Sequence, residues 1–171
     1  MTGLMTIEKS AAGRSSIVRL ALIAGIIVVL DQVTKLLIMR YLPMFDSIPV
    51  IPGFFSITHI HNPGGAFGIF AKAGPGVRNL FFLGVSFFAL CLVFYFYRTT
   101  PRTHPFLSGA FALIFSGAIG NLIDRLRIGE VIDFLDFYVG GWHWPAFNVA
   151  DSAITVGISI CIYHLVFNKM P

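Results

Sequence analysis

Four apolar segments limit what this chain can fold into: residues 17–39, 80–97, 105–123 and 148–167. A helix needs roughly 20 residues to cross a bilayer core of about 30 Å, and each segment is close to that length. Only 12% of the residues are charged and 56% are apolar, whereas about 25% of a soluble domain is charged. The sequence therefore predicts an all-α membrane protein with four transmembrane helices.

The length of 171 residues fits one domain. We expect this transmembrane domain to span residues 17–167, after a polar, mildly basic tail over residues 1–16. The tail and the first apolar segment are similar to a signal peptide, but no small-residue cleavage motif follows, so the first helix is expected to be retained. Cys91 and Cys161 lie inside apolar segments, where isolated thiols act as small hydrophobic groups. The cations are spread singly rather than gathered in a basic patch, which argues against nucleic-acid binding.

Residues 41–70 do not have a helical pattern. They contain four prolines, several glycines and the aromatic and β-branched run Phe54–His61, which is typical of short strands. Because bare strand edges cannot face lipid, this segment should form a small β-cradle at the membrane interface, over the helix ends. Residues 125–144 mix apolar and acidic residues and are also expected to be non-helical.

An even number of spans places both termini on one side of the membrane. The cations divide almost evenly between the two sides, which is a poor positive-inside contrast. The acidic residues divide unevenly, because only Glu8 lies on the terminal side and the other seven lie toward the opposite face. We expect cytoplasmic termini and a functional site on the opposite face.

Two polar motifs precede the third apolar segment. Asp31 and Lys35 are spaced i, i+4 and share a helical face, so they either neutralise each other or brace polar groups at a site. The segment Asn62–Phe67 is glycine-rich, and it either forms a plain turn or brings its backbone close to a substrate chain that Asn62 would hydrogen-bond.

Three further polar stretches lie between residues 120 and 151. The third apolar segment ends in Gly120–Arg125, where Asp124 and Arg125 could be an ordinary interfacial pair. Asp133 stands between Val-Ile and Phe-Leu pairs, where an unpaired carboxylate would be costly. The fourth segment opens with Asn148, which fits a helix N-cap, and this places Asp151 at N3 in a near capping box. Capping alone could explain Asp151, although the helix N-terminus would also favour its ionised form.

The turn between Asp133 and Asp151 could bring the two carboxylates together. Two like carboxylates in contact share a proton. One then acts as general base toward water while the other, protonated, polarises a carbonyl group, as in an aspartyl protease. We assign Asp151 as the ionised partner and Asp133, in its apolar surroundings, as the protonated one.

Other functions fit less well. The five histidines lack metal-ligand spacing, and no serine has a nucleophile motif around it. A small proton-coupled carrier is the main alternative, since intramembrane carboxylates also mark transport pathways. A carrier predicts acids near the bilayer midplane, however, and here they gather toward one face. A scaffold whose carboxylates only cap helices is a second alternative.

Five short motifs, in this order, resemble the lipoprotein signal peptidase (type II signal peptidase) family of bacteria. They are Asp31–Lys35, Asn62–Phe67, Gly120–Arg125, Val131–Phe134 and Phe147–Asp151. Each motif alone is nondescript, but five in order on four spans are specific, and the resemblance covers about residues 17–167.

The resemblance implies a monomeric inner-membrane aspartyl endopeptidase with a periplasmic β-cradle. Its substrates would be prolipoprotein signal peptides in the membrane lipid, cut before a diacylglyceryl-modified cysteine without a metal or other cofactor. Asp133 and Asp151 match the catalytic dyad. The match further implies substrate-binding and supporting positions: Asn62, Gly65, Ala66, Asn121, Arg125 and Asn148 for substrate, and Asp31, Lys35 and Asp124 as structural polar residues. Gly65 stands where alanine is common, which loosens the turn and removes no functional group.

Overall fold

The computed structural model describes residues 2–64, 74–167 and 169–171. Four helices make up most of the chain, and these are α1 (Thr2–Tyr41), α2 (Pro75–Thr99), α3 (Pro105–Ile128) and α4 (Val149–Val166). Each contains a segment long and apolar enough to cross a membrane. The predicted all-α membrane fold with four transmembrane helices is confirmed.

The helix ends have local causes. Proline occupies the first turn of both α2 and α3, where its missing N–H removes no hydrogen bond. Helix α3 ends at Gly129, whose φ of 79° is the left-handed conformation that glycine adopts without strain. The segment 125–128 therefore belongs to α3, which corrects our expectation that it is non-helical. The helix continues past the predicted boundary because no breaker occurs before Gly129.

Helix α3 lies at the centre of the bundle and packs against α1, α2 and α4. Of its most apolar window 44% is buried, against 6–22% in the other three helices, whose remaining surface is available to lipid. Close approach to α4 depends on small residues, since a Cβ on Gly117 would lie 2.3 Å from the carbonyl oxygen of Ala150.

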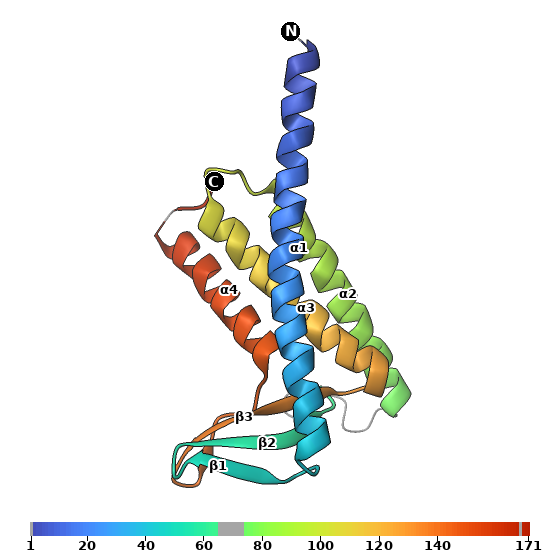
Figure 1. The fold of residues 1–171 in the computed structure, drawn as a ribbon, viewed down its shortest axis with the longest axis vertical. Coiled ribbons are helices and arrows are strands. Elements are labelled where there is room, and N and C mark those ends of the chain that lie inside the picture. The colour runs from blue at the N-terminus through green and yellow to red at the C-terminus, as the bar shows by residue number, and fades with distance from the viewer. Residues whose placement is uncertain (1, 65–73, 168) are drawn as a thin grey trace.

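A four-stranded antiparallel sheet crosses one end of the helices, and α1 extends past the other helices at the opposite end (Figure 1). The strands are β1 (Ser47–Ile51), β2 (Phe55–Asn62), β3 (Val131–Val139) and β4 (Trp142–His143), in that order across the sheet. The predicted β-cradle is present, but the range 41–70 is too narrow, because two strands come from residues 131–143. The sequence hid β3 because its first four residues are all buried, which removes the alternation typical of a strand.

Candidate active site

Asp133 lies on β3, facing the ends of α3 and α4. Its carboxylate accepts two hydrogen bonds, from Asn62 Nδ2 to Oδ2 at 2.9 Å and from Asn148 Nδ2 to Oδ1 at 2.7 Å. Only 2% of the residue is exposed. The pKa of Asp133 is raised to about 6, mainly by burial and also by the nearby charge of Asp151, whereas the hydrogen bonds from the two amides oppose the rise. A carboxyl group with this pKa is protonated much more readily than an ordinary aspartate.

Asp151 lies in the first turn of α4, as the sequence predicts. The capping box is present, with Asp151 N–H donating to Asn148 Oδ1 at 2.9 Å and Asn148 N–H donating to Asp151 Oδ2 at 3.3 Å. The other carboxylate oxygen, Oδ1, accepts a hydrogen bond from Asn121 Nδ2 at 2.7 Å. Capping therefore occupies one oxygen of Asp151 and the other faces α3. The two interpretations of this residue are compatible.

Asn148 links the two aspartates. Its side-chain amide donates to Asp133 and its backbone N–H donates to Asp151, and the residue itself is completely buried. The same amide nitrogen lies 3.3 Å from Asn121 Oδ1 and 3.2 Å from the carbonyl oxygen of Ile132. The turn between β3 and α4 thus holds both carboxylates against one rigid amide.

Lys35 holds the polar cluster to α1. Its ammonium lies 2.8 Å from Asp31 Oδ2, 2.7 Å from Asp124 Oδ2 and 3.1 Å from Asn121 Oδ1. Lys35 and both carboxylates are at most 2% exposed. One buried cation therefore pairs with carboxylates from two helices, and Asn121 connects this ionic group to Asp151.

The two supporting carboxylates also hold backbone. Asp31 Oδ1 accepts the N–H of Ala150 at 2.9 Å, and Asp124 Oδ2 accepts the N–H of Ile132 at 3.3 Å. These N–H groups belong to the residues just before Asp151 and Asp133. The ionic group under the site therefore fixes the backbone that carries both aspartates.

Gln32 belongs to this network, and the sequence analysis did not single it out. Its Nε2 lies 3.1 Å from Asp31 Oδ2 and 3.0 Å from Asp124 Oδ1, and its Oε1 accepts from Arg127 at 3.2 Å. Its place in the sequence, directly after Asp31 in an apolar segment, was the available signal.

Of the remaining predicted site residues, Asn62 and Arg125 lie near the two aspartates, whereas the other two fall outside the described part of the chain. Asn62 Oδ1 accepts the N–H of Gly64 at 2.9 Å, which orients the amide that it offers to Asp133. The guanidinium of Arg125 stacks over the ring of Phe82, 5.4 Å from its centre. It lies within electrostatic reach of three aspartates: Asp124, Asp133 and Asp151. Gly65 and Ala66 lie outside the described residues.

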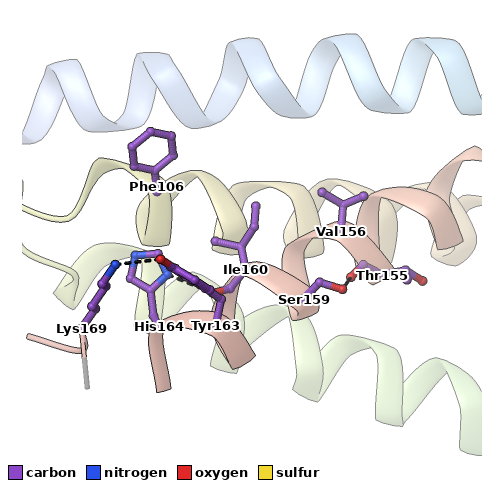
Figure 2. A pocket seen from close by; sticks show the side chains of 8 residues that line it. All are labelled: Phe106, Thr155, Val156, Ser159, Ile160, Tyr163, His164 and Lys169. Atoms are coloured by element: carbon purple, nitrogen blue, oxygen red, sulfur yellow. Dashed lines mark hydrogen bonds between the residues drawn. The ribbon is translucent and has the colours of Figure 1, made fainter. Parts of the chain in front are cut away.

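A cavity of about 620 Å³ runs along α4, away from the aspartates. Figure 2 shows its lining, in which Lys169 reaches back to the hydroxyl of Tyr163 at 2.7 Å. By surface area the lining is mostly apolar, and it comes from α3, α4 and the segment after α4: Phe106, Thr155, Val156, Ser159, Ile160, Tyr163, His164 and Lys169. Of the described residues that line it, none is a carboxylate, so hydrolytic chemistry is better sought in the polar cluster.

The cluster suits acid–base chemistry. Asp133 is a buried carboxyl group with a raised pKa, Asp151 is a carboxylate that accepts two N–H donors, and both are hydrogen-bonded to Asn148. Such a pair can take a proton from water and give one to a carbonyl oxygen. Among the described residues, no group of three or more His, Cys, Asp or Glu side chains could hold a metal ion.

Comparison with known proteins agrees with the motifs. A sequence model of the signal peptidase (SPase) II family matches residues 23–167. The lipoprotein signal peptidase of Desulforapulum autotrophicum is 56% identical over 91% of this chain and 96% of its own length. That of Geobacter sulfurreducens is 53% identical over 77% of this chain and 81% of its own.

Solved structures of bacterial membrane enzymes share the fold. A bacterial membrane enzyme determined by the in meso method at 1.9 Å resolution is 39% identical, with a TM-score of 0.77, over 86% of this chain and 92% of that one. A second such enzyme, at 2.3 Å resolution, is 37% identical with a TM-score of 0.78, over 88% of this chain and 89% of that one. The resemblance predicted from five short motifs is confirmed. With four helices able to span a membrane, this chain is a multi-pass bacterial membrane protein and belongs to the signal peptidase II family of proteases.

Proposed function

We propose that this chain is an aspartic endopeptidase that removes signal peptides from bacterial prolipoproteins by cutting before a diacylglyceryl-modified cysteine. The family is one of peptidases, and the relatives named above are lipoprotein signal peptidases. The observation that carries the aspartic mechanism is the pair Asp133 and Asp151, held on two sides of the buried Asn148. The carrier alternative is not supported, because the acids of the polar cluster lie at one end of the helices and the relatives are proteases.

The two aspartates have different roles in the proposed reaction. Asp151, at the N-terminus of α4 with two N–H donors, is the general base that takes a proton from a water molecule. Asp133 starts protonated and gives its proton to the scissile carbonyl oxygen as the water oxygen bonds to the carbonyl carbon. Collapse of the resulting diol returns one proton to Asp133, breaks the carbon–nitrogen bond and delivers the other proton from Asp151 to the leaving amine.

The rest of the cluster is assigned by position. Asn62 lies beside Asp133 and is placed to hydrogen-bond the extended substrate, and Arg125 lies near both aspartates at the end of α3. Asn121 and Asn148 orient the dyad, and Gly65 and Ala66 are proposed to approach the substrate backbone. We further propose cytoplasmic termini, a site facing the periplasm and a monomer in the inner membrane.

Single Asp133→Asn and Asp151→Asn variants test this proposal. Full-length protein in lipid should lose cleavage of a diacylglyceryl-modified prolipoprotein by about 10³-fold or more in either variant. Asp136→Asn is a matched control, since Asp136 lies on the same strand but pairs with His143 at 3.0 Å and should retain turnover within a few-fold.

The readouts must separate chemistry from folding. Each variant should accumulate, keep its thermal midpoint within a few degrees and still bind the lipid-modified peptide. Wild-type turnover in either aspartate variant would overturn the dyad. If a variant lost peptide binding and also failed to accumulate, the result would favour the structural alternative, in which the carboxylates only cap and brace the helices.

A further inference from the structure

A second, polar cavity lies at the opposite end of the helices from the sheet. It has a volume of about 280 Å³ and is lined by α1, the α2–α3 turn and α3: Ser16, Arg19, Thr100, Pro101, Arg102 and Ser108. Of the described residues that line it, two are arginines, three carry hydroxyl groups and none is acidic. A cavity that offers only cations and hydroxyls favours an anion with several oxygens.

The cavity is held by contacts between three helices. Arg19 of α1 donates a hydrogen bond to the hydroxyl of Ser108, which is 3% exposed on α3. The hydroxyl of Tyr97 on α2, itself 1% exposed, donates to the carbonyl oxygen of Ser16 at 2.6 Å. Arg19 has five N–H donors and Ser108 keeps its own hydroxyl hydrogen, so both retain donors after their mutual bond. Arg19 is therefore held in place by Ser108 and still able to bind a ligand, and the exposed Arg102 adds a second cation to the lining.

The position of the cavity along the helices indicates which part of the membrane its ligand occupies. Its residues mark the ends of three membrane-spanning segments, which begin at Ser16, end at Thr99 and begin again at Pro105. The phosphates of membrane lipids lie at this level. Water occupies about 30 Å³ in the liquid, so the cavity has room for a phosphate with part of its substituent.

We propose that this cavity binds the phosphodiester headgroup of an anionic phospholipid, such as phosphatidylglycerol. Arg19 and Arg102 bind the phosphate oxygens, and the serine and threonine hydroxyls bind the glycerol of the headgroup. A zwitterionic headgroup binds less well, because its ammonium would lie beside two arginines with no carboxylate on the wall to receive it. The site is separate from the aspartates and does not depend on their chemistry.

Native mass spectrometry of the full-length protein tests this inference. The protein is titrated with phosphatidylglycerol in detergent, and we expect one lipid per chain to bind tightly. Arg19→Gln with Arg102→Gln should weaken that binding by about 30-fold, which corresponds to about 2 kcal/mol at roughly 1 kcal/mol for each cation near a lipid surface.

The charge-matched control is Arg98→Gln with Lys169→Gln. This variant removes one cation from the last turn of α2 and one from just after the end of α4, and neither residue lines the cavity. It should bind phosphatidylglycerol like the wild type. Equal loss in both double variants would overturn the site, because it would show that general surface charge attracts the lipid.

Two further binding experiments determine the identity of the ligand. Phosphatidylcholine should bind much more weakly than phosphatidylglycerol, and equal binding would overturn the assignment of an anionic headgroup. Inorganic phosphate at millimolar concentration should leave the bound lipid in place, whereas displacement of the lipid would identify free phosphate as the ligand instead.

Discussion

At the sheet end of the helices, three buried carboxylates and a half-buried fourth form one polar cluster in which Lys35 pairs with Asp31 and Asp124, whereas at the opposite end two arginines and three hydroxyls line a cavity. The sheet end is closed by contacts among α1, α3, β3 and α4, and nearly every polar atom there is satisfied within the protein. At the opposite end, Arg19 and Ser108 retain hydrogen-bond donors after bonding each other. The difference indicates that most polar groups at the sheet end hold one another in position, whereas those lining the opposite cavity have fewer partners within the described residues.

Lys35→Met should cause the largest change in stability and is the strongest test of this contrast between the two ends. It leaves the carboxylates of Asp31 and Asp124 buried without their cation, and removing one partner of such a group costs about 3–5 kcal/mol. Arg19→Gln, at the opposite end, should change stability by less than about 1 kcal/mol. Thermal unfolding in detergent and the steady-state level in membranes measure both. Equal shifts would show that the two ends are not built differently.

The pH dependence of stability should reveal the buried acid at the sheet end. The pKa of Asp133 is about 6 in the folded protein, against an ordinary value of 3.8. The folded state thus binds this proton more tightly than the unfolded chain, so stability is greatest below about pH 4 and falls as the pH rises through 6.

The fall corresponds to about 3 kcal/mol at most. Thermal midpoints between pH 4 and 7 should therefore decline in the wild type and stay flatter in Asp133→Asn. Unchanged pH dependence in that variant would contradict the assignment. The same deprotonation predicts that kcat/KM falls above about pH 6, because the proposed acid is lost.

Two glycines of α3 lie in different surroundings, and alanine substitutions test how closely α3 and α4 pack at Gly117. A Cβ on Gly117 would meet the carbonyl oxygen of Ala150 at 2.3 Å, whereas a Cβ on Gly109 has nothing within 4 Å. We expect Gly117→Ala to destabilise by about 1–3 kcal/mol by forcing α3 and α4 apart. Gly109→Ala, its control near the opposite end, should be neutral or slightly stabilising. Similar midpoints for both variants would mean that α3 and α4 pack less closely near Gly117 than the structure shows.

The smallest expected effect concerns the hydrogen bond between Asn62 and Asp133. This bond lowers the pKa of Asp133, so Asn62→Ala should move the alkaline limb of the kcat/KM profile upward by about one pH unit. The measurement is the limb's position, which a general loss of activity would not change. A shift toward lower pH would mean that Asn62 does not stabilise the ionised carboxylate.

The sequence predicted the features that are local or carry a strong periodicity. The four apolar helices and the capping box of Asn148 and Asp151 are of this kind, since each depends on residues close together in the chain. The i, i+4 spacing predicted the pair of Asp31 and Lys35 but not the second carboxylate, Asp124, because that contact joins two helices. Strand β3 was missed for a related reason, since burial on both faces removed its alternation.

Asn148 also determines when the site comes into existence. Its amide bonds require the first turn of α4 to be formed and docked against both β3 and α3. In the proposed mechanism, a chain whose fourth helix has not yet docked lacks the arranged pair of aspartates. The proposed site therefore forms in the same step that completes the helix bundle.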